Sequence, residues 1–188
     1  GTRTVFKVLR QSSVTFKIEN GRQLPLPECS FRDYFKFTFV RNPYDRLISG
    51  WTDKVINGGS GGGIAKVKSP ARLMNFDYFV DWLTDQNPTE INIHYRPQTL
   101  LVPLQVNFIG RTESIEQDLR FILQKVGLEP VRSIPRANCS GPKRLSLKDI
   151  SSKTLDSIHE LYIHDFERFD YPIFDTSYGS VDGVDAPS

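Results

Sequence analysis

The sequence has 188 residues, enough for one domain that buries about 70% of the surface its unfolded chain exposes. Hydrophobic residues make up 38% and charged residues 24%, a composition typical of a soluble globular protein. The net charge of +2 is too small to favour a nucleic acid as partner. No apolar run is long enough for a membrane span, so membrane association is not indicated.

The two cysteines and three histidines show none of the spacings that zinc sites use. We therefore expect the protein to work without a metal ion.

Residues 1–10 predict a loop that enters a helix. Gly1, Thr2, Arg3 and Thr4 offer backbone N–H groups, hydroxyls and a guanidinium just before the helix starts. Such a combination suits a bound anion. A frayed terminus is the alternative interpretation.

Residues 35–54 predict a strand that leads directly into a helix. Residues 35–40 are mostly aromatic or β-branched, and Asn42-Pro43 then supplies a helix N-cap and a proline in the first turn. Arg41 therefore ends the strand, and Ser49 lies on the helix. A guanidinium, a hydroxyl and a helix N-terminus that converge would bind a phosphate. An exposed helix with surface salt bridges is the alternative.

Five residues of this stretch form a spaced motif: Arg41, Pro43, Arg46, Ser49 and Lys54. The motif resembles the 3′-phosphate motif of sulfotransferases that use 3′-phosphoadenylyl sulfate (PAPS). The resemblance implies that Arg41 and Ser49 hold the 3′-phosphate of the nucleotide. Residues 1–4 resemble the second half of the 5′-phosphosulfate loop of the same family. The first strand and the Pro-Lys of that loop would precede Gly1.

Residues 57–70 are rich in glycine and contain two lysines. They do not match a Walker A motif, because no Gly-Lys-Ser/Thr ends the run, and this argues against a P-loop kinase or NTPase. We expect a mobile surface loop on the acceptor side. Asn75 then caps a helix with a buried stripe formed by Phe76, Phe79, Val80 and Leu83.

Residues 91–101 place polar side chains between prolines in a predicted loop. The run His94-Tyr95-Arg96-Pro97-Gln98 resembles a segment of sulfotransferase family 2, the carbohydrate sulfotransferases and their bacterial relatives. We expect His94 to act as the catalytic base or as a contact to the acceptor. A histidine with a purely structural hydrogen bond is the alternative.

Residues 106–127 predict a strand–helix unit of a parallel sheet. The strand covers 106–110, and a capping box from Ser114 to Gln117 starts a helix that ends at Gly127. The predicted inward side chains are Ile115, Leu119, Ile122, Leu123 and Val126.

Residues 129–146 contain three prolines and several cations, which predicts a loop. The resemblance implies that this loop closes over the nucleotide, with Lys143 and Arg144 among the binding residues. A solvated basic loop is the alternative. A last helix ends at Phe169, its two histidines are expected to be structural, and residues 175–188 predict a disordered tail.

Together the motifs imply an α/β fold, the P-loop NTPase-like three-layer sandwich around a parallel sheet, over residues 1–174. The implied enzyme transfers a sulfuryl group from PAPS to a hydroxyl of an acceptor, expected to be a carbohydrate. The alternative is a pseudoenzyme that binds the product nucleotide PAP, or a truncated inactive domain. That alternative stays open because the lysine expected before Gly1 is not in the sequence.

Animal members of the family work in the Golgi lumen and usually carry cysteines after the histidine motif. No cysteine closely follows His94. We therefore expect a cytosolic enzyme of bacterial type, with the Golgi lumen as the alternative if the natural N-terminus carries a membrane anchor.

Overall fold

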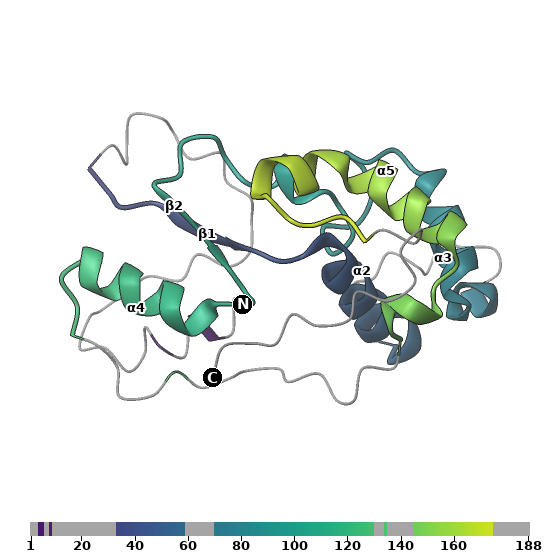
Figure 1. The fold of residues 1–188 in the computed structure, drawn as a ribbon, viewed down its shortest axis with the longest axis horizontal. Coiled ribbons are helices and arrows are strands. Elements are labelled where there is room, and N and C mark those ends of the chain that lie inside the picture. Colours follow the sequence, from purple (N-terminus) through teal and green to yellow (C-terminus); the bar gives the residue numbers. More distant parts are fainter. Residues whose placement is uncertain are drawn as a thin grey trace. The chain divides into compact units, whose positions relative to one another are not determined.

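The computed structural model describes residues 4, 5, 8, 33–58, 70–129, 134 and 145–174, and it has the predicted α/β class (Figure 1). The chain forms two compact units. The first contains Gly1–Arg41 and Val102–Gly141, and the second contains Asn42–Leu101 and Pro142–Ser188. Across the described ranges, no helix combines the length and the apolar character needed to cross a membrane.

The first unit is built on two parallel strands, β1 (Phe37–Val40) and β2 (Phe108–Arg111). Phe37 pairs with Phe108, and the register continues to Val40 opposite Arg111. The pairing begins at Asn107, whose side-chain oxygen accepts from the Lys36 N–H at 2.8 Å. Both predicted strands are confirmed, each starting two residues later than the sequence pattern suggested.

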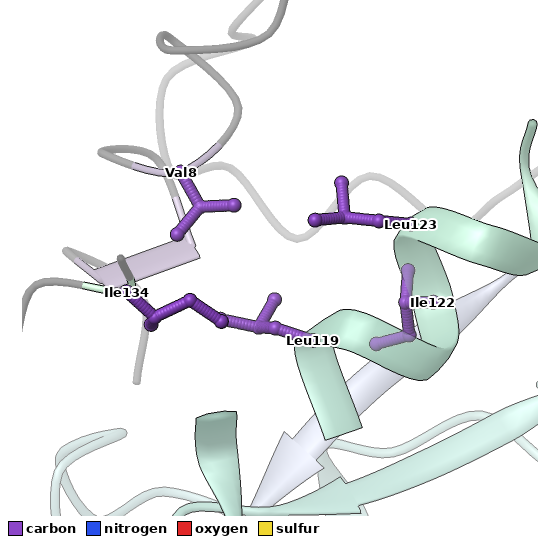
Figure 2. Close-up of a cluster of buried hydrophobic side chains, with 5 residues drawn as sticks. All are labelled: Val8, Leu119, Ile122, Leu123 and Ile134. Carbon is purple, nitrogen blue, oxygen red and sulfur yellow. The ribbon is translucent and has the colours of Figure 1, made fainter. Parts of the chain in front are cut away.

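Helix α4 (Ile115–Lys125) packs its apolar face on this sheet. Figure 2 shows the buried cluster that results. Its members are Val8, Leu119, Ile122, Leu123 and Ile134. The rings of Phe37, Phe39 and Phe108 pack against the cluster from the strands. Burial of this apolar surface is the main force that holds α4 to the sheet.

Two details at the ends of α4 differ from the prediction. The Ser114 side chain makes no capping bond to the helix backbone. It donates instead to the Asp118 carboxylate at 2.9 Å, and the same carboxylate accepts from the Arg111 N–H at 2.7 Å. The predicted capping box was therefore wrong, because Asp118 competes for the hydroxyl. Val126 is exposed, since the helix ends at Lys125.

The second unit starts with α2 (Pro43–Trp51), the helix predicted from the phosphate motif. The Asn42 side-chain oxygen accepts from Tyr44 N–H at 3.0 Å and from Asp45 N–H at 3.4 Å, as expected of an N-cap. One turn of π-helix, Thr52–Ile56, continues α2 and carries Lys54. π-Turns of this kind are often found at functional sites.

Helices α3 (Phe76–Thr84) and α5 (Ser152–Phe169) belong to the second unit, and the predicted buried stripe of α3 is confirmed. Asn75 caps α3 by accepting from Tyr78 N–H at 2.9 Å. The Thr154 hydroxyl of α5 donates to the Asp77 carboxylate of α3 at 2.6 Å. The backbone of α5 leaves helical geometry at Tyr162, with φ −115° and ψ 20°.

Aromatic side chains form much of the core of the second unit. Three pairs have ring centroids about 5 Å apart: Tyr44 with Phe166 at 5.0 Å, and Trp51 with Phe76 and Phe79 with Tyr95 at 5.1 Å each. Such tilted and edge-on pairs add to the hydrophobic stabilisation. They join α2, α3, α5 and the segment that contains His94 into one packed body.

Candidate active site

The two residues predicted to hold the 3′-phosphate lie where the sequence pattern placed them locally. Arg41 directly follows β1 and belongs to the first unit, and Ser49 is a half-buried residue of α2 in the second unit. Their meeting at one phosphate stays a prediction.

The start of α2 offers less to an anion than the sequence suggested. Asn42 already accepts from the N–H groups of Tyr44 and Asp45, and Asp45 adds a negative charge in the first turn. A phosphate there would compete with the cap and with this carboxylate. The side chains of Arg41 and Ser49 are therefore better candidates than the helix N-terminus itself.

A cavity of about 290 Å³ opens beside the start of α2. Asn42, Asp45 and Ile48 line one part of it, and residues 145–148 with Phe174 line the rest. Residue 145 directly follows Lys143 and Arg144, the cations predicted to contact the nucleotide. The cavity combines apolar walls with an amide, a carboxylate and an ammonium group.

His94 lies on the surface of the second unit, on a turn formed by residues 93–95. Its N–H donates to the Asn92 side-chain oxygen at 3.0 Å, which fixes the backbone of the turn. Partial burial lowers the pKa of the His94 imidazole below its ordinary 6.5, and the Lys54 and Arg46 cations lower it further. The Asp53 carboxylate acts in the opposite direction. The imidazole is therefore neutral at neutral pH and able to accept a proton.

Lys54 contributes to this environment from the π-turn. Its side chain is only 13% exposed, and its ammonium group lies 3.0 Å from the Asp53 carboxylate. A cation held in this way is less screened by water than a surface lysine, so its effect on a neighbouring imidazole is larger.

Arg46 has a role that the motif did not reveal. Its guanidinium donates to the Ile93 carbonyl oxygen at 2.8 Å, one residue before His94. Burial lowers the pKa of Arg46, while nearby Tyr162 and Asp165 oppose this change, and the side chain stays charged. Arg46 thus supports the histidine turn.

Gly50 explains how α2 comes so close to this turn. A Cβ atom at Gly50 would lie 3.2 Å from the Tyr95 ring and 3.4 Å from the His94 carbonyl oxygen. A glycine makes this approach possible without displacing the Tyr95 ring. No local pattern could predict this contact, since it joins segments more than 40 positions apart.

The remaining predicted site residues are Gly1, Thr2, Arg3, Thr4, Lys143 and Arg144. Thr4 is buried, at 3% exposure, in the first unit. Gly1, Thr2, Arg3, Lys143 and Arg144 lie outside the described residues, as do positions 59–69 of the glycine-rich segment and the predicted tail 175–188. These assignments therefore stay predictions.

In the part of the chain that the structure describes, the other two histidines contact residues of their own helix, α5. The His159 ring packs against Phe166 at 5.6 Å, and His164 Nδ1 lies 3.2 Å from the Glu167 carboxylate. Within the described part of the chain, no three His, Cys, Asp or Glu side chains come together in a way that could hold a metal ion.

Comparison with known proteins now decides the family. The sequence model of the sulfotransferase family matches residues 7–172. This chain belongs to the sulfotransferase family. The resemblance predicted from the phosphate motif and the His94 segment is thereby confirmed.

Several relatives of this sulfotransferase are carbohydrate sulfotransferases of vertebrates. Carbohydrate sulfotransferase 14 of Danio rerio is 30% identical over 169 residues, which cover 78% of this chain and 46% of that protein. Human carbohydrate sulfotransferase 14 is 30% identical, covering 74% and 43%, and human carbohydrate sulfotransferase 9 is 28% identical, covering 73% and 38%. The chain thus spans less than half the length of these relatives. No solved structure shows a significant match.

The expectation of a cytosolic enzyme of bacterial type was wrong. Relatives from fish, frog, mouse, rat and human carry the name carbohydrate sulfotransferase. They are the animal branch of the family, for which the resemblance implied the Golgi lumen. The missing cysteine after His94 was too weak a signal to separate the two branches.

Proposed function

We propose that this sulfotransferase transfers a sulfuryl group from PAPS to a hydroxyl of a carbohydrate acceptor. The observation that carries the proposal is the environment of His94. Its imidazole is exposed, its pKa is lowered, and it lies on a turn that contacts α2, the helix of the 3′-phosphate motif. The family match over residues 7–172 and the names of the relatives support the same chemistry.

In this mechanism the acceptor oxygen attacks sulfur in line with the bond that breaks. The new O–S bond forms as the bond from sulfur to the phosphate oxygen of PAPS breaks, and PAP leaves with the electron pair. His94 accepts the proton of the attacking hydroxyl. Catalysis otherwise depends on positioning and on donors near the leaving oxygen, as in phosphoryl transfer.

The nucleotide would be held by the residues of the predicted motifs. Arg41 and Ser49 bind the 3′-phosphate, and the loop of residues 1–4 binds the 5′-phosphate. Lys143 and Arg144 close over the nucleotide. They directly precede residues 145–148, which line the cavity together with Asn42. We propose that residues 1–174 form the P-loop NTPase-like three-layer sandwich, of which β1, β2 and α4 are a part.

The test is the replacement Arg41→Ala, with PAP binding measured by isothermal titration calorimetry. Hydrogen bonds between charged groups are worth about 1.5–3 kcal/mol each, so we expect the affinity to fall at least about tenfold. Arg120→Ala is the matched control, because it removes an exposed arginine whose ion pair with Glu116 spans one turn of α4. Unchanged affinity in Arg41→Ala would refute the assignment.

Transfer must be measured separately from binding. PAPS labelled on its sulfate is incubated with a panel of oligosaccharides and polysaccharides, using the wild type and His94→Ala. Transfer that is lost in His94→Ala, with PAP affinity kept, supports the mechanism. PAP binding by the wild type without transfer to any acceptor would favour the binding-only alternative.

A further inference from the structure

Helix α5 presents three polar side chains to the backbone of the segment that follows His94. The Tyr162 hydroxyl donates to the Tyr95 carbonyl oxygen at 2.5 Å. The Asp165 carboxylate accepts from the N–H groups of Gln98 and Thr99, each at 2.7 Å. Arg168 adds a bond to the Thr99 carbonyl oxygen at 3.3 Å. These contacts join positions 66 to 69 residues apart, all within the second unit.

Asp165 is the centre of this arrangement. Its side chain is completely buried, at 0% exposure, and each of its oxygens faces one main-chain N–H group. Burial of a carboxylate costs several kcal/mol unless its oxygens are hydrogen-bonded. The carboxylate therefore stabilises only the backbone conformation that turns both N–H groups toward it, the start of the 3₁₀ turn Gln98–Leu100.

Buried or half-buried side chains thus hold the backbone on both sides of His94. Arg46 of α2 bonds the carbonyl of Ile93, the residue before it, and Tyr162 of α5 bonds the carbonyl of Tyr95, the residue after it. Tyr162 sits where the α5 backbone leaves helical geometry. The His94 side chain itself is exposed, so the backbone that carries it has a large part in setting its direction.

We propose that Asp165 and Tyr162 are positioning residues for His94. They fix the segment from Tyr95 to Thr99 so that the imidazole keeps its place beside Lys54 and Arg46 and meets the acceptor hydroxyl in one orientation. The inference rests on the proposed function, in which His94 is the base, and extends it to two side chains of α5 that bond the backbone of the segment after the base.

Two variants test the proposal. Asp165→Asn keeps the volume but turns an NH₂ group toward one of the two N–H donors, so one bond is lost. Tyr162→Phe removes only the hydroxyl. The control is Asp77→Asn, which weakens the bond from Thr154, another polar contact of α5, directed at α3 and not at the histidine segment.

The first measurement is an NMR titration of the three histidines, which needs no acceptor. In both variants we expect the His94 pKa to move back toward its ordinary value, because a displaced imidazole is less buried and lies further from Lys54 and Arg46. Its other charged neighbour, Asp53, is in the same π-turn as Lys54. Asp77→Asn should leave the His94 titration as it is in the wild type.

The second measurement is sulfuryl transfer at saturating PAPS, together with PAP affinity. We expect kcat to fall about 10- to 100-fold in Asp165→Asn, less in Tyr162→Phe, with PAP affinity unchanged. If the His94 titration is the same in all variants, the positioning role is refuted, even if stability falls. If Asp165→Asn does not fold, Tyr162→Phe decides by the same titration.

The experiments distinguish failure of the proposed function from failure of the positioning role. If the wild type does not bind PAP or His94→Ala keeps full transfer, the proposed chemistry fails, whereas the titration still reports whether α5 positions the histidine.

Discussion

Arg46 belongs to the 3′-phosphate motif, but its side chain bonds to the protein backbone. It lies three residues before Ser49 on α2, a place from which an arginine could also reach a phosphate. Its guanidinium instead donates to the Ile93 carbonyl oxygen at 2.8 Å. We therefore predict that Arg46→Met destabilises the fold and changes the affinity for PAP by no more than about twofold.

The size of the effect follows from what methionine keeps and what it removes. Methionine retains an apolar stem that packs like that of arginine, so mainly the charged hydrogen bond is lost. Such a bond is worth about 1.5–3 kcal/mol, and a chain of this size loses roughly 2–4 °C of melting temperature per kcal/mol. We expect the melting temperature to fall by about 3–12 °C.

The assay combines thermal unfolding with calorimetric titration of PAP. Arg120→Met serves as control, because Arg120 is exposed and its ion pair with Glu116 on α4 contributes little. A loss of PAP affinity of more than tenfold with unchanged unfolding would show that Arg46 binds the phosphate and that its bond to Ile93 is incidental. Equal destabilisation of both variants would contradict the argument from burial.

Two further predictions concern the sheet and the base. Gly110→Ala should cost about 1–3 kcal/mol of unfolding free energy, because the new Cβ would lie 2.6 Å from the Phe39 ring. Urea unfolding measures it, and Phe39→Leu in the same background should recover part of the loss; a fully stable single variant would speak against the register. In the proposed mechanism the neutral form of His94 is the active one, and its pKa is lowered, so the acid limb of kcat/KM should lie below the pH expected of an ordinary imidazole. Lys54→Met should move this acid limb to higher pH, and a shift in the other direction would contradict the electrostatic argument.

Much of the fold could be predicted because its signals are local. Apolar spacing, a cap and a following proline determined α2, and Asn75 with its aromatic stripe determined α3. The capping box of α4 was predicted from the same kind of signal and was wrong. Asp118, one turn into the helix, offered Ser114 a stronger acceptor than the backbone contact.

The support of His94 could be predicted only in part. Ile158, Tyr162, Asp165 and Phe169 follow each other at helical spacing, a signal that could have placed one carboxylate on the buried face of α5, although this was not predicted. Its partners are main-chain N–H groups 66 and 67 positions away, and backbone groups have no sequence signature. The same holds for Arg46, whose partner is the carbonyl of Ile93.

In the proposed mechanism the base serves a carbohydrate hydroxyl and therefore has to be exposed, which explains why the polar side chains that support it act through the backbone. An exposed side chain cannot be oriented by its own packing, so its direction has to come from the backbone that carries it. Apolar residues at positions 46, 162 and 165 could pack the same space with similar stability. They would not fix the direction of the carbonyl and N–H groups between Ile93 and Thr99. The polar side chains therefore contribute conformational specificity at the histidine turn, at a cost in desolvation that packing alone would not incur.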